Sequence, residues 1–302
     1  MTARIDPAAI NGWIVLDKPL ALSSAQGVAA VKRILRTNGL PVPRIGHGGT
    51  LDPLATGVLP IALGEATKLA GRMLDAAKGY DFTVQFGTQT STLDAEGEVV
   101  ATSDVRPSTD AIIAVLPRFT GPIDQVPPVY SALKVDGKRA YALARAGEEV
   151  VLATRRITVH SIALQATTPD SATFSTLVSK GTYIRSLARD IALALDSVGH
   201  VTMLRRTHSG PFSLAQAISL DKLAELVQGD AIEQAVLPLM TGLDDIPALA
   251  ITPEEAAALK QGRKLLGHPA SNGTYLAARG SVPVALVEAQ SGEVRVLRGF
   301  NL

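Results

Sequence analysis

The chain has 302 residues, of which 46% are hydrophobic and 19% charged, a composition typical of a folded soluble protein. Its net charge of +1 argues against a polycation that binds nucleic acid indiscriminately, and the absence of cysteine excludes disulfides, thiolate metal sites and a thiol nucleophile. Residues 1–10 lack the pattern of a signal peptide, and no apolar run approaches the roughly 20 residues of a membrane span. We therefore expect a cytoplasmic protein with one large domain and one small one.

In chain order, the first predicted elements precede a glycine-rich loop. Residues 12–16 are predicted as a short buried strand, and Ser23 or Ser24 as the cap of a helix over about residues 25–35. Residues 37–50 contain four glycines and two prolines and are expected to be a loop. The elements expected next are a helix (65–74), a strand (80–86), a polar turn (88–97), a helix (109–119) and an ordered loop with three prolines (120–129).

The second part of the chain continues this alternation. The expected elements are a helix (139–146), two strands (154–165 and 171–178), an amphipathic helix (182–195), a linker (244–251), a helix (252–261) and short strands with glycine turns (273–300). On the helix at 182–195, Arg185 and Arg189 lie away from the apolar side. Strands and helices that alternate at irregular intervals favour an α+β fold on a mixed sheet.

Positive charge is concentrated in two segments. Residues 178–210 contain five Lys or Arg against two acids, and residues 131–160 contain six against three. Such clusters are usually solvated faces, but two of them in one chain also suggest a phosphate-binding surface.

The most informative segment is residues 46–59, GHGGTLDPLATGVL. Asp52 is its single carboxylate, and residues 46–64 contain no other acid and no Lys or Arg. The proline after Asp52 biases the aspartate toward extended or turn backbone. Two interpretations follow from the residues alone. Asp52 is either a catalytic group held on a rigid turn, with His47 nearby, or a turn aspartate that accepts backbone hydrogen bonds.

This segment resembles the G-H-x-G-T-L-D-P-x-A-x-G-V-L motif of the TruB family of tRNA pseudouridine synthases, in which the single Asp is the catalytic residue. The resemblance continues in the family's order over about residues 11–220, through residues 12–19 (GWIVLDKP), 64–68 (GEATK), 78–80 (KGY), 181–187 (GTYIRSL) and 204–207 (LRRT). Gly48 departs from the motif, because the family usually has Thr there. We expect a looser loop at Gly48 with no effect on Asp52 or His47.

The resemblance implies an α+β fold with a mixed-sheet pseudouridine synthase catalytic domain and a small C-terminal PUA-like β-barrel. The catalytic domain is expected over residues 1–245, with an RNA-binding insert at about 121–146. The PUA-like domain is expected over residues 248–302.

The resemblance also assigns roles to individual residues. It implies catalytic roles for Asp52, Tyr80 and Arg185, with Arg185 as the ion-pair partner that stabilises the charge of Asp52 and fixes its orientation. The implied substrate-binding residues are His47, Tyr80, Tyr183, Leu204 and Lys68. Arg205 and Arg206 join Lys68 as candidate phosphate contacts, and Lys18 with Pro19 is expected to support the site. From the residues alone, Arg185 is a solvent-facing helix residue, each tyrosine is half-buried core, and His47 has no second ligand at metal-binding spacing.

The implied function is an isomerase that converts the uridine at position 55 of tRNA, in the TΨC loop, to pseudouridine. Asp52 is the expected nucleophile on a flipped-out base, acting on the ribose or the base or through a glycal-type intermediate. The reaction has no net redox change, so no cofactor and no metal are expected. The expected partner is the TΨC stem-loop of tRNA, with no guide RNA, no membrane and a monomeric enzyme. The alternatives are an RNA-binding module without catalysis and an Asp-nucleophile hydrolase, and the chain supplies no suitable second carboxylate for the latter.

Overall fold

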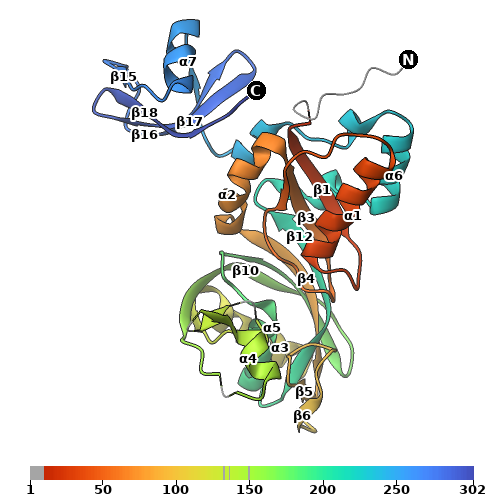
Figure 1. Ribbon diagram of the computed structural model, residues 1–302. Coiled ribbons are helices and arrows are strands. Elements are labelled where there is room, and N and C mark those ends of the chain that lie inside the picture. Colours follow the sequence, from red (N-terminus) through yellow and green to blue (C-terminus); the bar gives the residue numbers. More distant parts are fainter. Residues whose placement is uncertain (1–9, 132, 136, 149) are drawn as a thin grey trace.

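A computed structural model describes residues 10–131, 133–135, 137–148 and 150–302. Figure 1 shows a large body built on a long twisted sheet and a smaller body formed by the C-terminal strands. The expectation for residues 1–10 lies outside the described part of the chain, apart from Ile10. No helix among the described residues is long and apolar enough to cross a membrane.

The large body is organised by a nine-stranded mixed sheet. Its main strand order is β1 (Gly12–Lys18), β3 (Ala55–Leu63), β12 (Gly199–Ser209), β4 (Lys78–Phe86), β11 (Ser171–Val178), β10 (Arg155–Thr167) and β7 (Gly121–Gln125). Two short strands extend it, because β2 (Ile45–His47) pairs with β3 and β13 (Phe212–Ser213) pairs with β12. The β12–β3 pair is parallel and the other pairs of this sheet are antiparallel, which confirms the predicted mixed sheet.

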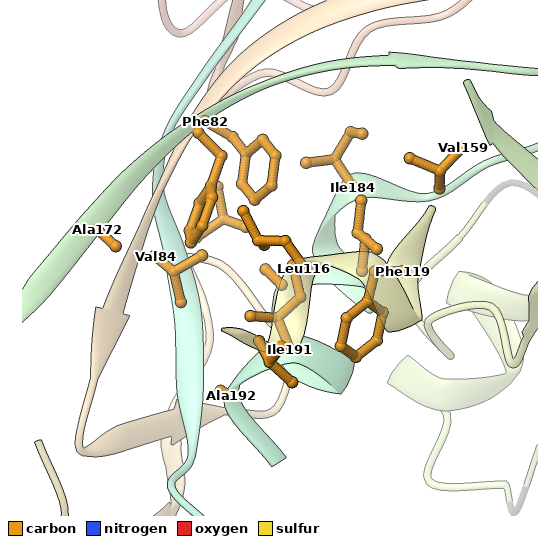
Figure 2. Close-up of a cluster of buried hydrophobic side chains, with 14 of the residues drawn as sticks. Phe82, Val84, Leu116, Phe119, Val159, Ala172, Ile184, Ile191 and Ala192 are labelled. Carbon is orange, nitrogen blue, oxygen red and sulfur yellow. The ribbon is translucent and has the colours of Figure 1, made fainter. Parts of the chain in front are cut away.

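Two groups of helices pack against this sheet, one toward each of its two ends. The α-helices are α1 (Ser24–Thr37), α2 (Ala70–Asp75), α3 (Thr109–Val115), α4 (Ala140–Arg145), α5 (Ile184–Ala194), α6 (Leu220–Gln228) and α7 (Pro253–Lys260). Helices α1 and α6 share a core with β1 and β3, and helices α3 and α5 share another with β4, β10 and β11. Figure 2 shows the second core, where Phe82 and Val84 of β4 approach Leu116, Phe119 and Ile191.

Shorter elements connect these layers. They are the 3-10 helices η2 (Gly64–Leu69), η3 (Leu116–Phe119), η4 (Leu214–Gln216), η5 (Ile232–Gln234) and η6 (Leu239–Leu243), the hairpin of β5 (Thr88–Thr90) with β6 (Val99–Thr102), and the hairpin of β8 (Lys134–Val135) with β9 (Lys138–Arg139).

The smaller body is a curled five-stranded sheet covered by α7. Its order is β14 (Ala248–Ala250), β16 (Gly273–Arg279), β17 (Val282–Gln290), β18 (Glu293–Gly299) and β15 (Leu265–Leu266). Phe300, Leu276 and Leu286 pack into one buried cluster with Trp13 and Phe212 of the large body. The two bodies are therefore joined by a shared hydrophobic cluster as well as by the chain.

Several predicted elements differ from the structure. The expected loop at 120–129 contains β7, which pairs with β10 from Val159↔Gly121 to Arg155↔Gln125. Pro122 is tolerated because β7 is an edge strand and needs no ladder donor on its outer side. The expected helix at 65–74 is η2 followed by α2, the loop at 37–50 contains β2, and the turn at 88–97 contains β5. The expected linker at 244–251 is too long, because Ala248–Ala250 already belongs to the second sheet.

Candidate active site

The site lies where the two cores of the large sheet meet. Tyr80 on β4 and Leu204 on β12 pack against both cores. A cavity of about 260 Å³ opens beside them. Five residues singled out from the sequence line this cavity, namely Asp52, Tyr80, Tyr183, Arg185 and Leu204. The fold thus gathers them from a loop, two strands and a helix.

Asp52 lies in the loop between β2 and β3, and buried cations hold the backbone on both sides of it. The side chain of Asp52 is 44% exposed. Arg206 binds two backbone carbonyls that precede Asp52 in the chain. Its Nη1 donates to the Thr50 carbonyl at 3.2 Å and its Nη2 donates to the Gly49 carbonyl at 3.3 Å. The backbone that carries the Asp52 carboxylate is therefore held in place by hydrogen bonds from a buried side chain.

Arg206 is a structural residue. It is 1% exposed, and its Nε also donates to the Val58 carbonyl at 2.7 Å. The expectation that Arg206 contacts phosphate is wrong, because the guanidinium is enclosed and engaged by backbone acceptors. Gly57 shows how close the packing is, since a Cβ there would lie 2.2 Å from the Arg206 carbonyl oxygen and φ is +100°.

Lys18 supports the loop from the other side, as the expected role for Lys18 and Pro19 requires. Its ammonium is fully buried and donates to the carbonyls of Pro19 at 3.0 Å, Leu22 at 2.6 Å and Pro53 at 3.4 Å. Burial lowers the pKa of Lys18 from 10.5 to about 8, while the nearby Asp52 carboxylate opposes that shift. Lys18 thus adds a second positive group close to Asp52.

Arg185 lies between two carboxylates. Its Nη2 is 2.9 Å from Asp52 Oδ2 and its Nη1 is 3.2 Å from Asp94 Oδ2. The same two nitrogens also donate to backbone carbonyls, Nη1 to that of Thr92 at 2.8 Å and Nη2 to that of Tyr130 at 3.0 Å. Arg185 is 7% exposed, so the interpretation of a solvent-facing residue is wrong. The structure contains the ion pair with Asp52 that the resemblance implies.

Tyr183 is the N-cap residue of helix α5, and the buried side chain of Gln125 holds its backbone. Gln125 is 2% exposed, accepts from the Tyr183 backbone N–H at 2.9 Å and donates to the Tyr183 carbonyl at 3.2 Å. Burial raises the pKa of the Tyr183 hydroxyl above its usual 10. A neutral phenol therefore lines the cavity near Asp52 and Arg185.

The structure does not bring His47 or Lys68 to the lining of this cavity. His47 lies on β2, where burial and the charge of Arg206 lower the pKa of its imidazole. Its Nδ1 is among the buried side-chain atoms that have no hydrogen-bond partner in the described part of the chain. Lys68 lies on η2, and its Nζ binds Glu65 Oε2 at 2.6 Å and the Gly299 carbonyl at 2.9 Å. No observation tests the RNA contacts that the resemblance implies for these two residues.

Comparisons with known proteins agree with this geometry. The model of the TruB family pseudouridylate synthase N-terminal domain matches residues 32–184, which is half of the chain, and the model of the tRNA pseudouridylate synthase B C-terminal domain matches residues 185–244. The chain belongs to the TruB family.

TruB relatives cover the whole chain. A protein of Novosphingobium aromaticivorans called tRNA pseudouridine synthase B is 61% identical over 298 residues, which covers 97% of this chain and 98% of the relative. A protein of the same name from Zymomonas mobilis is 57% identical over 302 residues, all of both chains. A solved Cbf5-Nop10-Gar1 complex matches with a TM-score of 0.75 and 29% identity over 96% of this chain and 85% of that chain. An H/ACA RNP bound to a substrate RNA containing 2'-deoxyuridine matches with a TM-score of 0.74 and 27% identity, with the same coverage.

Gly48, where this chain departs from the TruB motif, is closely packed. A Cβ at Gly48 would lie 2.6 Å from Met73 Cβ, and the Gly48 N–H donates to the Pro60 carbonyl at 2.8 Å. Met73 thus occupies the space next to Gly48, where the family usually has a Thr side chain.

Six further residues line the cavity, namely Thr50, Leu51, Ser131, Leu133, Thr182 and Ile184. The first two and the last two lie in the segments 46–59 and 181–187 that carry the TruB resemblance, although no individual role was predicted for them, whereas Ser131 and Leu133 lie outside every such segment. Asp94, 7% exposed, also went unpredicted, because an acid in the polar turn at 88–97 reads as an ordinary turn residue. Among the described residues, no three His, Cys, Asp or Glu side chains gather closely enough to hold a metal ion.

Proposed function

We propose that this TruB-family chain converts the uridine at position 55, in the TΨC loop of tRNA, to pseudouridine, with Asp52 as the nucleophile. The observation that carries the proposal is the Asp52 carboxylate. It is 44% exposed at the wall of a cavity and paired with a buried guanidinium at 2.9 Å. A carboxylate that is both accessible and held in one orientation meets the requirements of a nucleophile.

The reaction is an isomerisation that needs no co-reactant. The bond between N1 of the base and C1′ of the ribose breaks, the detached base turns, and C5 forms a new bond to C1′. The proton lost from C5 is balanced by a proton gained at N1, so no redox cofactor and no ATP are required. Asp52 can act on the ribose, on the base, or by assisting elimination to a glycal, and in each route it must lie beside the reacting nucleotide.

The other residues of the cavity hold the base while its glycosidic bond is open. A base inside a folded tRNA loop must first leave its stack to reach an enclosed site. Tyr80 and Leu204 line the cavity from neighbouring strands, and Tyr183 lines it from the start of α5. We assign substrate binding to these three side chains and to His47 an RNA contact outside the cavity.

The proposal includes the partners and the division of the chain. The substrate is tRNA without a guide RNA, the enzyme is a cytoplasmic monomer, and no metal or cofactor takes part. We assign residues 1–245 to the catalytic domain with an RNA-binding insert at about 121–146, and residues 248–302 to a PUA-like domain that grips tRNA. The separate second sheet formed from β14 onward supports the boundary.

The test is the substitution Asp52→Asn. Tritium release from 5-labelled uridine in a TΨC stem-loop measures turnover, and filter binding measures affinity, both with no other RNA present. We expect Asp52→Asn to abolish turnover and to leave affinity within about tenfold, because phosphate contacts dominate such interfaces. Asp81→Asn is the matched control, because Asp81 follows Tyr80 on β4 but does not line the cavity. Turnover near that of the wild type for Asp52→Asn would overturn the proposal.

A further inference from the structure

Two adjacent serines at the start of helix α1 have different structural roles. Ser23 is the N-cap, since its Oγ accepts from the Gln26 backbone N–H at 3.2 Å and its own N–H donates to Gln26 Oε1 at 2.8 Å. This reciprocal pair completes a capping box. The hydroxyl of Ser24, the next residue, is therefore not needed to cap the helix.

Ser24 instead binds the loop that carries Asp52. Its Oγ accepts from the Leu51 backbone N–H at 2.7 Å and donates to the Leu51 carbonyl at 3.1 Å. Ser24 is 2% exposed and Leu51 is 4% exposed, so water does not compete for these bonds. One hydroxyl thus satisfies both backbone groups of the residue that precedes the nucleophile.

The position of this contact matters because the Leu51 carbonyl belongs to the peptide group that joins Leu51 to Asp52. A planar peptide that is fixed at its oxygen also fixes its nitrogen, which is the backbone nitrogen of Asp52. The direction of the Asp52 side chain then depends on few free torsions. Arg206 holds the carbonyls before Leu51 and Lys18 holds the carbonyl of Pro53.

We infer that Ser24 is a positioning residue for the nucleophile. It transmits the rigidity of helix α1 to Asp52 through the two hydrogen bonds to Leu51. The inference rests on the proposed role of Asp52. Arg185 orients the carboxylate of Asp52 through an ion pair, whereas Ser24 holds the backbone before Asp52 through its hydrogen bonds to Leu51. Without the Ser24 hydroxyl, the ion pair between Asp52 and Arg185 remains, but the Asp52 carboxylate is no longer held in a single orientation toward the nucleotide.

The experiment compares variants of the two adjacent serines. Ser24→Ala removes both hydrogen bonds, and Ser24→Cys keeps a side chain of similar volume with a much weaker donor and acceptor. Ser23→Ala is the matched control, because it removes the N-cap of the same helix without touching Leu51. The single-turnover rate constant at saturating enzyme, the Kd for tRNA and the Tm are measured for each variant.

We expect both Ser24 variants to lower the single-turnover rate constant by about ten- to a hundredfold, the loss typical of a reacting group misplaced by about 1 Å. Their Kd should stay within about threefold of the wild type, because a positioning contact acts on the chemical step and not on uniform binding. Ser23→Ala should lower Tm by roughly 2–4 °C, through loss of a helix cap, and leave the rate constant within about twofold.

Amide hydrogen exchange gives a second readout that does not depend on activity. The Leu51 N–H should exchange faster in both Ser24 variants and at the wild-type rate in Ser23→Ala. Rate constants within twofold of the wild type for Ser24→Cys, or equal losses in Ser23→Ala and Ser24→Ala, would overturn the inference. If Ser24→Ala does not fold, Ser24→Cys decides alone. A wild-type chain that forms no pseudouridine would instead overturn the proposed function.

Discussion

Nη2 of Arg185 lies 2.9 Å from Oδ2 of Asp52. The same guanidinium group is also paired with the buried carboxylate of Asp94. The second pair explains how a nearly buried arginine can face a half-exposed aspartate and keep one orientation. All four hydrogen-bonding and ionic partners of Arg185 come from segments other than α5. The orientation of the Asp52 carboxylate therefore depends on contacts between segments that are distant in the sequence.

Arg185→Met should lower kcat by at least about a hundredfold, because it removes the group that aligns the nucleophile. Affinity for tRNA should change little, since Arg185 is 7% exposed. Arg189→Met is the control on the same helix, where the side chain binds Asp190 and the Val126 carbonyl. Equal loss of binding in both variants with chemistry intact would place Arg185 on the RNA surface.

Arg206→Ala should destabilise the fold, in contrast to Arg205→Ala. Arg206 binds three backbone carbonyls in a buried setting, whereas Arg205 forms a partly exposed pair with Asp17 at 2.8 Å. Loss of Arg206 leaves buried acceptors unpaired, at about 3 kcal/mol or a fall in Tm of roughly 5–10 °C. Arg205→Ala should cost less than about 1 kcal/mol. Thermal unfolding followed by circular dichroism compares the two, and similar Tm values would contradict the structural role of Arg206.

The sequence predicts the features of this molecule that depend on local pattern. The β11 strand was predicted at its observed bounds because apolar and polar residues alternate between clear turns. The loop of Asp52 was predicted because glycines and a proline surround a lone carboxylate. Both signals are contained within a few adjacent residues.

What escaped prediction depends on contacts between distant segments. The acceptors of Arg206 lie about 150 residues away in sequence, so its burial is invisible in a cluster of positive charge. The burial of Asp94 is also invisible in the sequence, because its ion-pair partner Arg185 lies far away in the chain, on α5. Strand β7 forms because β10 offers an edge, although its own residues suggest a loop. Propensity is overridden at such places by tertiary pairing.

Of the two buried lysines, only Lys18 is expected to affect the pH dependence of kcat. Burial lowers the pKa of Lys18 and of Lys78 from 10.5 to about 8. Lys18 binds the Pro53 carbonyl beside Asp52, whereas Lys78 binds the carbonyls of Met73, Leu74 and Ala76. As pH rises past about 8, wild-type kcat should fall because Lys18 loses its charge. The fall should disappear in Lys18→Met and persist in Lys78→Met, and its persistence in both variants would assign it to another group.

Stability should change in the opposite direction over the same pH range. Between pH 8 and 10.5 the unfolded chain keeps protons that folded Lys18 and Lys78 have lost, so the free energy of unfolding rises with pH on account of these groups. Urea unfolding at pH 7.5 and pH 9 measures this difference, with each Lys→Met variant as a reference. The variant with both Lys18→Met and Lys78→Met serves as a further reference. If the unfolding free energy of the wild type rises between pH 7.5 and pH 9 by no more than that of this double variant, the two lysines titrate normally.

Lys68 should stabilise the junction between the two bodies and contribute little to RNA binding. Its Nζ binds Glu65 Oε2 and the Gly299 carbonyl, and the same Oε2 accepts from the Asn301 N–H at 2.7 Å. Lys68→Met and Glu65→Gln should therefore each lower Tm slightly, and the double variant should lose less than the sum, as coupled residues do. The salt slope of tRNA binding should be unchanged in Lys68→Met, because the ammonium is already engaged. A slope reduced by about one unit, with additive Tm changes, would instead make Lys68 the phosphate contact that the family resemblance implies.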